Sequence, residues 1–121
     1  MNDIIFSYTR EQAIADGVLI DVSKMAAEAG FRYPVALTQA VWGDCVAVSK
    51  EDEGQDEQGR LWDILNVLRC SIRSAGGGQL VHFDVLVAKG GKPPQPINLK
   101  AHCGPGDELE PVITVMLPHE D

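Results

Sequence analysis

The sequence has no long apolar run, few aromatic residues and only three cysteines. Unbroken apolar runs such as residues 18–20 and 85–88 fall far short of the roughly 20 residues that cross a bilayer. The first residues lack the basic start and apolar stretch of a targeting peptide, so we expect a cytoplasmic protein without a membrane segment. Cys45, Cys70 and Cys103 are too widely spaced for a paired metal motif or a disulfide framework, and we expect them to be reduced, mostly buried thiols.

Basic residues are also scarce. Ten Lys and Arg against 18 Asp and Glu leave a formal net charge of -8, the opposite of the basic footprint that binds nucleic acid directly. Residues 50–57 and 107–110 together carry seven of these eight net negative charges. The acids are therefore concentrated in two segments rather than spread along a surface. We expect residues 50–57 to be a mobile loop that folding does not require.

What is present is typical of a globular domain. The 121 residues are 45% hydrophobic and 23% charged, close to the average composition, and we expect one domain over residues 1–121. In the N-terminal half, Thr9 and Gln12 form a capping box for a short helix that ends before Gly17. Ser23 is placed to cap a second helix over residues 24–29, and Thr38 a third that buries Trp42 and Cys45. The segment between the first two, residues 18–22, is predicted to be extended.

A longer helix is predicted over residues 60–75. Apolar residues recur there at three- and four-residue steps and form one stripe. The stripe comprises Leu61, Ile64, Leu65, Leu68, Ile72 and Ala75.

After the glycines at 76–78 the apolar period changes to two, which indicates strands over residues 81–87, 97–103 and 112–117. Pairing the first two strands by their apolar faces, with Phe83 opposite Ala101, would place Asp84 opposite Lys100. A type II turn at residues 104–107 would lead to the third strand. We therefore predict an α+β fold, with short N-terminal helices and one long helix packed on an antiparallel β-meander. The predicted core contains Leu65, Leu68, Phe83, Val85, Leu99 and Val115.

Three segments are characteristic: residues 8–23 (YTREQAIADGVLIDVS), 29–38 (AGFRYPVALT) and 110–118 (EPVITVMLP). Together with residues 60–63 and 104–108, they resemble a family of small uncharacterised bacterial proteins. The resemblance covers most of the chain and implies a bacterial origin and an association with mobile genetic elements. It implies no activity, substrate or catalytic residue.

One weak candidate for metal binding is the polar face of the predicted hairpin. The expected register brings together His82, Asp84 and His102, and two imidazoles with a carboxylate can bind zinc. An exposed strand face needs polar residues in any case, so we favour a solvated face. No nucleophile motif accompanies it, and we expect no cofactor and no catalytic residues.

A stronger candidate lies on the long helix, outside the apolar stripe. Trp62, Asn66, Arg69 and Arg73 share one side, and tryptophan and arginine often dominate protein interfaces. The alternative is that a neighbouring element covers Trp62 within the fold. We predict a cytoplasmic accessory module that binds a protein partner through this surface, with association between copies left open. The other hypotheses are an acidic inhibitor of host nucleases that imitates DNA and a small metal-dependent enzyme using His82 and His102.

Overall fold

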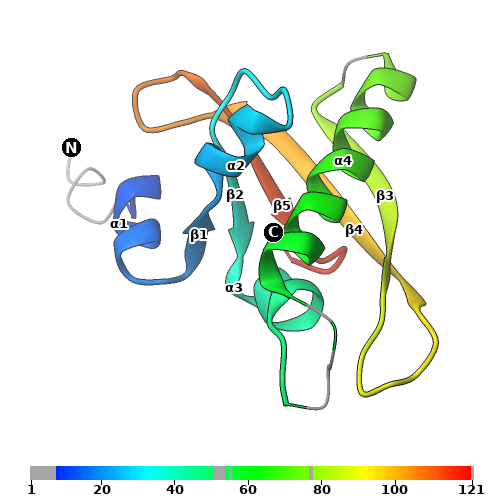
Figure 1. Ribbon diagram of the computed structural model, residues 1–121. Helices are drawn as coiled ribbons and strands as arrows, with labels where there is room; N and C mark the ends of the chain where they lie inside the picture. Colours follow the sequence, from blue (N-terminus) through cyan, green and yellow to red (C-terminus); the bar gives the residue numbers. More distant parts are fainter. Residues whose placement is uncertain (1–7, 51–53, 55, 77, 121) are drawn as a thin grey trace.

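The computed structural model describes residues 8–50, 54, 56–76 and 78–120 (Figure 1). Its helical elements are α1 (Arg10–Ala15), α2 (Ser23–Glu28), α3 (Gln39–Val41), the π-helical turn η2 (Trp42–Val46) and α4 (Glu57–Ala75). Its strands are β1 (Leu19–Asp21), β2 (Val35–Thr38), β3 (Leu80–Val87), β4 (Gln95–Pro105) and β5 (Pro111–Met116). Within the described residues, no helix combines the length and the apolar character needed to cross a membrane.

The strands form one mixed sheet in the order β1-β2-β5-β4-β3. Helices α2 and α4 lie in front of this sheet in Figure 1, and α1 lies beside β1. The α+β class is therefore confirmed, but the antiparallel meander is only part of the sheet. Strands β3, β4 and β5 are antiparallel as predicted, whereas β2 was not predicted and pairs parallel with β5 in the centre.

The short helices begin largely where their capping residues predict. Thr9 accepts a hydrogen bond from the Gln12 backbone at 3.0 Å, and the Gln12 side chain accepts from Thr9 in return. Thr38 caps α3. Ser23 is not a cap, because it is already the first residue of α2 and its hydroxyl contacts Asp21 instead.

Helix α4 begins at Glu57, three residues earlier than predicted. Asp56 is its N-cap and accepts from the Gly59 N–H at 2.5 Å, which extends the helix backwards into the acidic segment. Gly76, in the left-handed conformation with φ 72°, ends it. Part of the predicted acidic loop, residues 51–53 and 55, lies outside the described residues.

The predicted register between β3 and β4 is wrong by two residues. Phe83 lies opposite Leu99 rather than Ala101, and Asp84 lies opposite Asn98 rather than Lys100. The alternation of apolar residues specifies which side chains face the core, but it is equally satisfied by a shift of two. Both strands therefore present the predicted faces in a different alignment.

The connection between β4 and β5 also differs from the predicted type II turn. Gly106 does not have the positive φ that this turn requires, and the left-handed residue is Leu109, with φ 66°. The turn is closed by the Leu109 N–H, which donates to the Gly106 carbonyl at 3.0 Å. A longer loop therefore projects the acids of residues 107–110 beyond the sheet.

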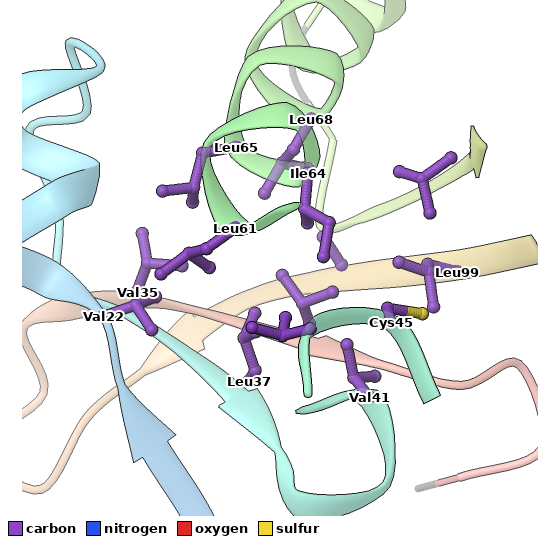
Figure 2. Packing of buried hydrophobic residues seen from close by; sticks show 14 of the residues in the cluster. Val22, Val35, Leu37, Val41, Cys45, Leu61, Ile64, Leu65, Leu68 and Leu99 are labelled. Carbon is purple, nitrogen blue, oxygen red and sulfur yellow. The ribbon is translucent and has the colours of Figure 1, made fainter. Parts of the chain in front are cut away.

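The predicted core residues are buried in a single cluster between α4 and the sheet, together with residues from α2, α3 and η2. Figure 2 shows the α4 side chains of Leu61, Ile64, Leu65 and Leu68 directed into this cluster. Cys45 is fully buried there, while Trp42 is only partly buried. Ala75, predicted to share the stripe, is exposed because the last turn of α4 extends past the core.

Candidate functional site

The predicted surface of α4 is accessible, but three of its four residues divide between two neighbouring features, and Trp62 lines neither. Trp62 is 39% exposed, and Arg69 and Arg73 are also exposed. Arg69 and Arg73 line a cavity between α4 and the segment after α2. Asn66 instead lines a groove between α4 and β3. The surface is thus not covered within the fold, and its two arginines belong to a more specific feature.

That feature is a cavity of about 370 Å³, which we call the arginine pocket. The segment that follows α2 and the C-terminal half of α4 form its sides, and strands β3, β4 and β5 contribute to its floor. Its lining residues are Gly30, Phe31, Arg32, Tyr33, Arg69, Ile72, Arg73, Gly78, Val81, Ala101, Cys103 and Ile113.

The end of α2 positions one side of the pocket. The Gly30 N–H donates to the Ala27 carbonyl and the Phe31 N–H to the Ala26 carbonyl, the hydrogen-bond pattern of a Schellman motif. Gly30 has φ 103°, as this motif requires at its left-handed position. A Cβ atom at Gly30 would also lie 3.0 Å from Arg69 Nε, so glycine leaves room for the guanidinium group.

The pocket combines an apolar interior with local positive charge. The guanidinium groups of Arg32, Arg69 and Arg73 form no hydrogen bond or ion pair with any other described residue, in a protein of net charge -8. Guanidinium groups bind carboxylates and phosphates through paired hydrogen bonds. Phe31 and Tyr33 add aromatic surface beside them. The pocket is therefore suited to a ligand with an anionic group attached to an apolar body.

The lining is poorly suited to acid–base or metal chemistry. It contains neither a carboxylate nor an imidazole among the described residues. Cys103, half-buried in the floor, supplies its thiol.

His82, Asp84 and His102 do not converge as the predicted register required. His82 lies opposite Lys100, and His102 lies opposite Leu80. Asp84 accepts a hydrogen bond from the Asn98 side chain at 2.9 Å. Among the described residues, no group of three His, Cys, Asp or Glu side chains is arranged to hold a metal ion.

The cysteines differ more from each other than predicted. All three are free, but only Cys45 is fully buried, whereas Cys70 is exposed on α4. Burial raises the pKa of the Cys45 thiol to about 11, with a smaller contribution in the same direction from Asp44. Cys45 is therefore a protonated core residue at neutral pH.

Sequence reasoning missed Phe31, Arg32 and Tyr33 as site residues. Two aromatics flanking an arginine between Gly30 and Pro34 were a usable signal, because such residues are enriched at interfaces. What the sequence did not show is that this segment faces Arg69 and Arg73, nearly forty positions later.

Comparison with protein-family models identifies a match over residues 1–121 to a family of unknown function, DUF6573. The chain belongs to the DUF6573 family. Neither a curated protein nor a solved structure matches it. Membership of DUF6573 agrees with the resemblance to uncharacterised proteins and assigns no function to any residue.

Proposed function

We propose that this DUF6573 protein is a non-catalytic binding module that takes a short segment of a partner protein into the arginine pocket. The observation that carries the proposal is an apolar cavity bordered by three arginines whose guanidinium groups have no partner among the described residues. A carboxylate that enters would gain charge-assisted hydrogen bonds without displacing an existing ion pair. The pocket is therefore prepared for an acidic ligand.

The chemistry of the lining specifies the segment further. Phe31, Tyr33 and Ile72 offer apolar contacts, and the volume of about 370 Å³ lies at the small end of the range for ligand sites, roughly 300–1,000 Å³. This space suits one or two side chains. We propose an acidic residue adjacent to an aromatic or aliphatic one.

An extended segment fits the wider surface better than a free small molecule. Each residue of an α-helix is rotated by about 100° from the one before it. Around the axis of α4, Trp62 therefore points within about 20° of Arg69 and of Arg73, so the three residues share one side of the helix. The distance along the axis from Trp62 to Arg73 is roughly 16 Å, which about five extended residues span. A segment anchored in the pocket would continue along α4 and cover the exposed indole.

We also propose that the protein works in the cytoplasm of a bacterium and serves a process linked to mobile genetic elements. The resemblance of residues 8–23, 29–38 and 110–118 to uncharacterised bacterial proteins supports this setting. Identification of captured partners from such a host would test it.

The proposed function is tested with a peptide library in which acidic, aromatic and aliphatic positions vary. We expect the protein to select peptides with an acidic residue next to an apolar one. The double variant Arg69→Gln, Arg73→Gln should weaken binding of a selected peptide by at least about tenfold, because hydrogen bonds to charged groups each contribute on the order of 1.5–3 kcal/mol. Fluorescence anisotropy measures both affinities.

The matched control is Lys24→Gln, Lys92→Gln, which removes the same charge from two exposed positions outside the pocket. This variant should bind like the wild type, and both variants should retain the wild-type melting temperature. Equal weakening by the two variants would mean that only net charge matters. Selection of peptides without an acidic residue would refute the proposal.

A further inference from the structure

Strand β3 forms an open edge of the sheet. The carbonyl of Gln79 accepts from the Cys103 N–H at 2.8 Å, so the odd-numbered residues that follow direct their backbone groups towards β4. The even-numbered residues of β3 direct their backbone N–H and C=O groups away from β4, towards the open edge. These residues are Leu80, His82, Asp84 and Leu86, and their backbone groups have no hydrogen-bond partner among the described residues.

This edge lacks most of the features that normally prevent strand pairing. Such features are short length, proline, bulges and charged side chains, above all lysine, and Asp84 is the one charged residue of β3. β3 is eight residues long, contains neither lysine nor proline, and pairs with β4 without interruption. On the face of the sheet opposite the core, the side chains of Leu80 and Leu86 are 51% and 69% exposed. By contrast, the opposite edge strand, β1, has only three residues.

The space beside β3 is open. A groove of about 690 Å³ runs between α4 and β3 and is lined by residues of both, including Asn66, Cys70 and Leu80. No described element fills it. A further strand could therefore approach the edge without rearranging the fold.

The sequence of β3 is complementary to itself in one antiparallel alignment. If Phe83 lies opposite Phe83 of a second copy, then Leu80 pairs with Leu86 and His82 with Asp84. The core-facing residues remain on one side in this alignment, because paired residues keep the same parity. Shifting the axis to Asp84 would place two carboxylates directly opposite each other, which is unfavourable.

We propose that two copies of the chain associate through their β3 edges, antiparallel and with the two-fold axis at Phe83. Leu80, His82, Asp84 and Leu86 then exchange roughly eight backbone hydrogen bonds with the second copy. The two sheets become continuous, and the two exposed leucines of each copy cover those of the other. The interface is isologous, as a two-fold dimer requires. It is independent of the proposed peptide binding, since the arginines of the pocket lie on a different side of α4 from the groove.

The association is tested on the full chain by sedimentation equilibrium over a range of concentrations. The wild type should form a concentration-dependent dimer. Leu86→Lys should raise the dissociation constant by roughly tenfold or more, because the substitution acts twice across the axis. The matched control, Leu109→Lys, adds the same charge at a leucine that is 82% exposed on the β4–β5 loop, and it should leave the dissociation constant unchanged.

A charge exchange tests the alignment itself. His82→Asp places two acids opposite each other in both symmetric pairs and should weaken the dimer, whereas adding Asp84→Lys should restore it.

Amide hydrogen exchange should show concentration-dependent protection at Leu80, His82, Asp84 and Leu86. A monomer at all concentrations, or a dimer that responds equally to Leu86→Lys and Leu109→Lys, would overturn the proposal. Failure of the double variant to recover would overturn the alignment at Phe83.

Discussion

Single side chains join parts of the chain that are distant in sequence. The buried Arg60 donates through Nη1 to the Ala47 carbonyl at 2.6 Å and through Nη2 to the Ala88 carbonyl. It thereby ties the start of α4 to the segment after η2 and to the end of β3. Its charged group satisfies two carbonyls that no strand partner reaches, which explains a buried arginine beside an apolar core.

Cys45 provides a prediction at this scale. Because its pKa is raised in the folded protein, the unfolded chain loses the thiol proton first as the pH increases. The free energy of unfolding should therefore fall between pH 9 and pH 11, by as much as about 2 kcal/mol. Urea unfolding at several pH values should show a smaller fall for Cys45→Ala. Parallel curves for the two proteins would contradict the assignment.

At the scale of elements, α1 depends on a loop almost a hundred residues away. The Asp107 carboxylate accepts from the N–H groups of Arg10 at 2.7 Å and Glu11 at 3.0 Å. The Arg10 guanidinium in turn donates to Thr114 Oγ1 and the Ile113 carbonyl on β5. Burial lowers the pKa of Arg10, and nearby acids, Asp21 among them, oppose that shift. Helix α1 is thus held at its first turn and by one side chain against the sheet.

Asp107→Ala should accordingly loosen α1. Removing two hydrogen bonds at a helix N-terminus costs on the order of 0.5–2 kcal/mol, and the exposed position favours the lower part of this range. Hydrogen exchange in α1 should accelerate more than exchange in α4. Glu108→Ala is the control, because the Glu108 carboxylate has no hydrogen bond with a described residue. Equal effects of the two variants would show that the cap contributes nothing.

For the whole molecule, the central contact is between α4 and the sheet. Leu65 and Leu68 of α4 are fully buried in the cluster that also contains Phe83 of β3, Leu99 of β4 and Val115 of β5. Loss of a side chain there leaves a cavity that the surrounding layers cannot close completely. This packing should make the helix and the sheet unfold together.

Leu68→Ala should lower the free energy of unfolding by about 2–5 kcal/mol, a large part of the 5–15 kcal/mol typical of a domain. Circular dichroism and tryptophan fluorescence should report the same shifted transition. Leu109→Ala, the same change at an exposed leucine, should have little effect. A Leu68→Ala protein of ordinary stability would show that α4 is not central to the core.

Much of the fold was predictable because it depends on local patterns. The capping box at Thr9, the stripe of α4 and the alternation in β3 each encode an element through neighbouring residues. Strand β2 was missed because its four residues carry a short apolar run that periodicity cannot distinguish from other structures. Only pairing with β1 and β5 makes it a strand.

The candidate site was predictable in part. Arg69 and Arg73 could be grouped from helical spacing alone, since both lie on one side of a regular helix. The remainder of the pocket depends on where the segment after α2 packs. The Schellman motif at Gly30 is local, but the approach of Arg69 to that glycine is a contact between elements.

By itself, the sequence determined which segments become α1, α4, β3, β4 and β5 and which of their side chains face the core. Those properties follow from the periodicity of helices and strands, which a single segment carries within itself. Tertiary structure alone decided the register of Phe83 with Leu99, the parallel pairing of β2 with β5 and the cap that Asp107 provides. The physical reason is that a two-residue shift preserves every local pattern. The choice between such arrangements depends on loop closure and on packing between distant residues.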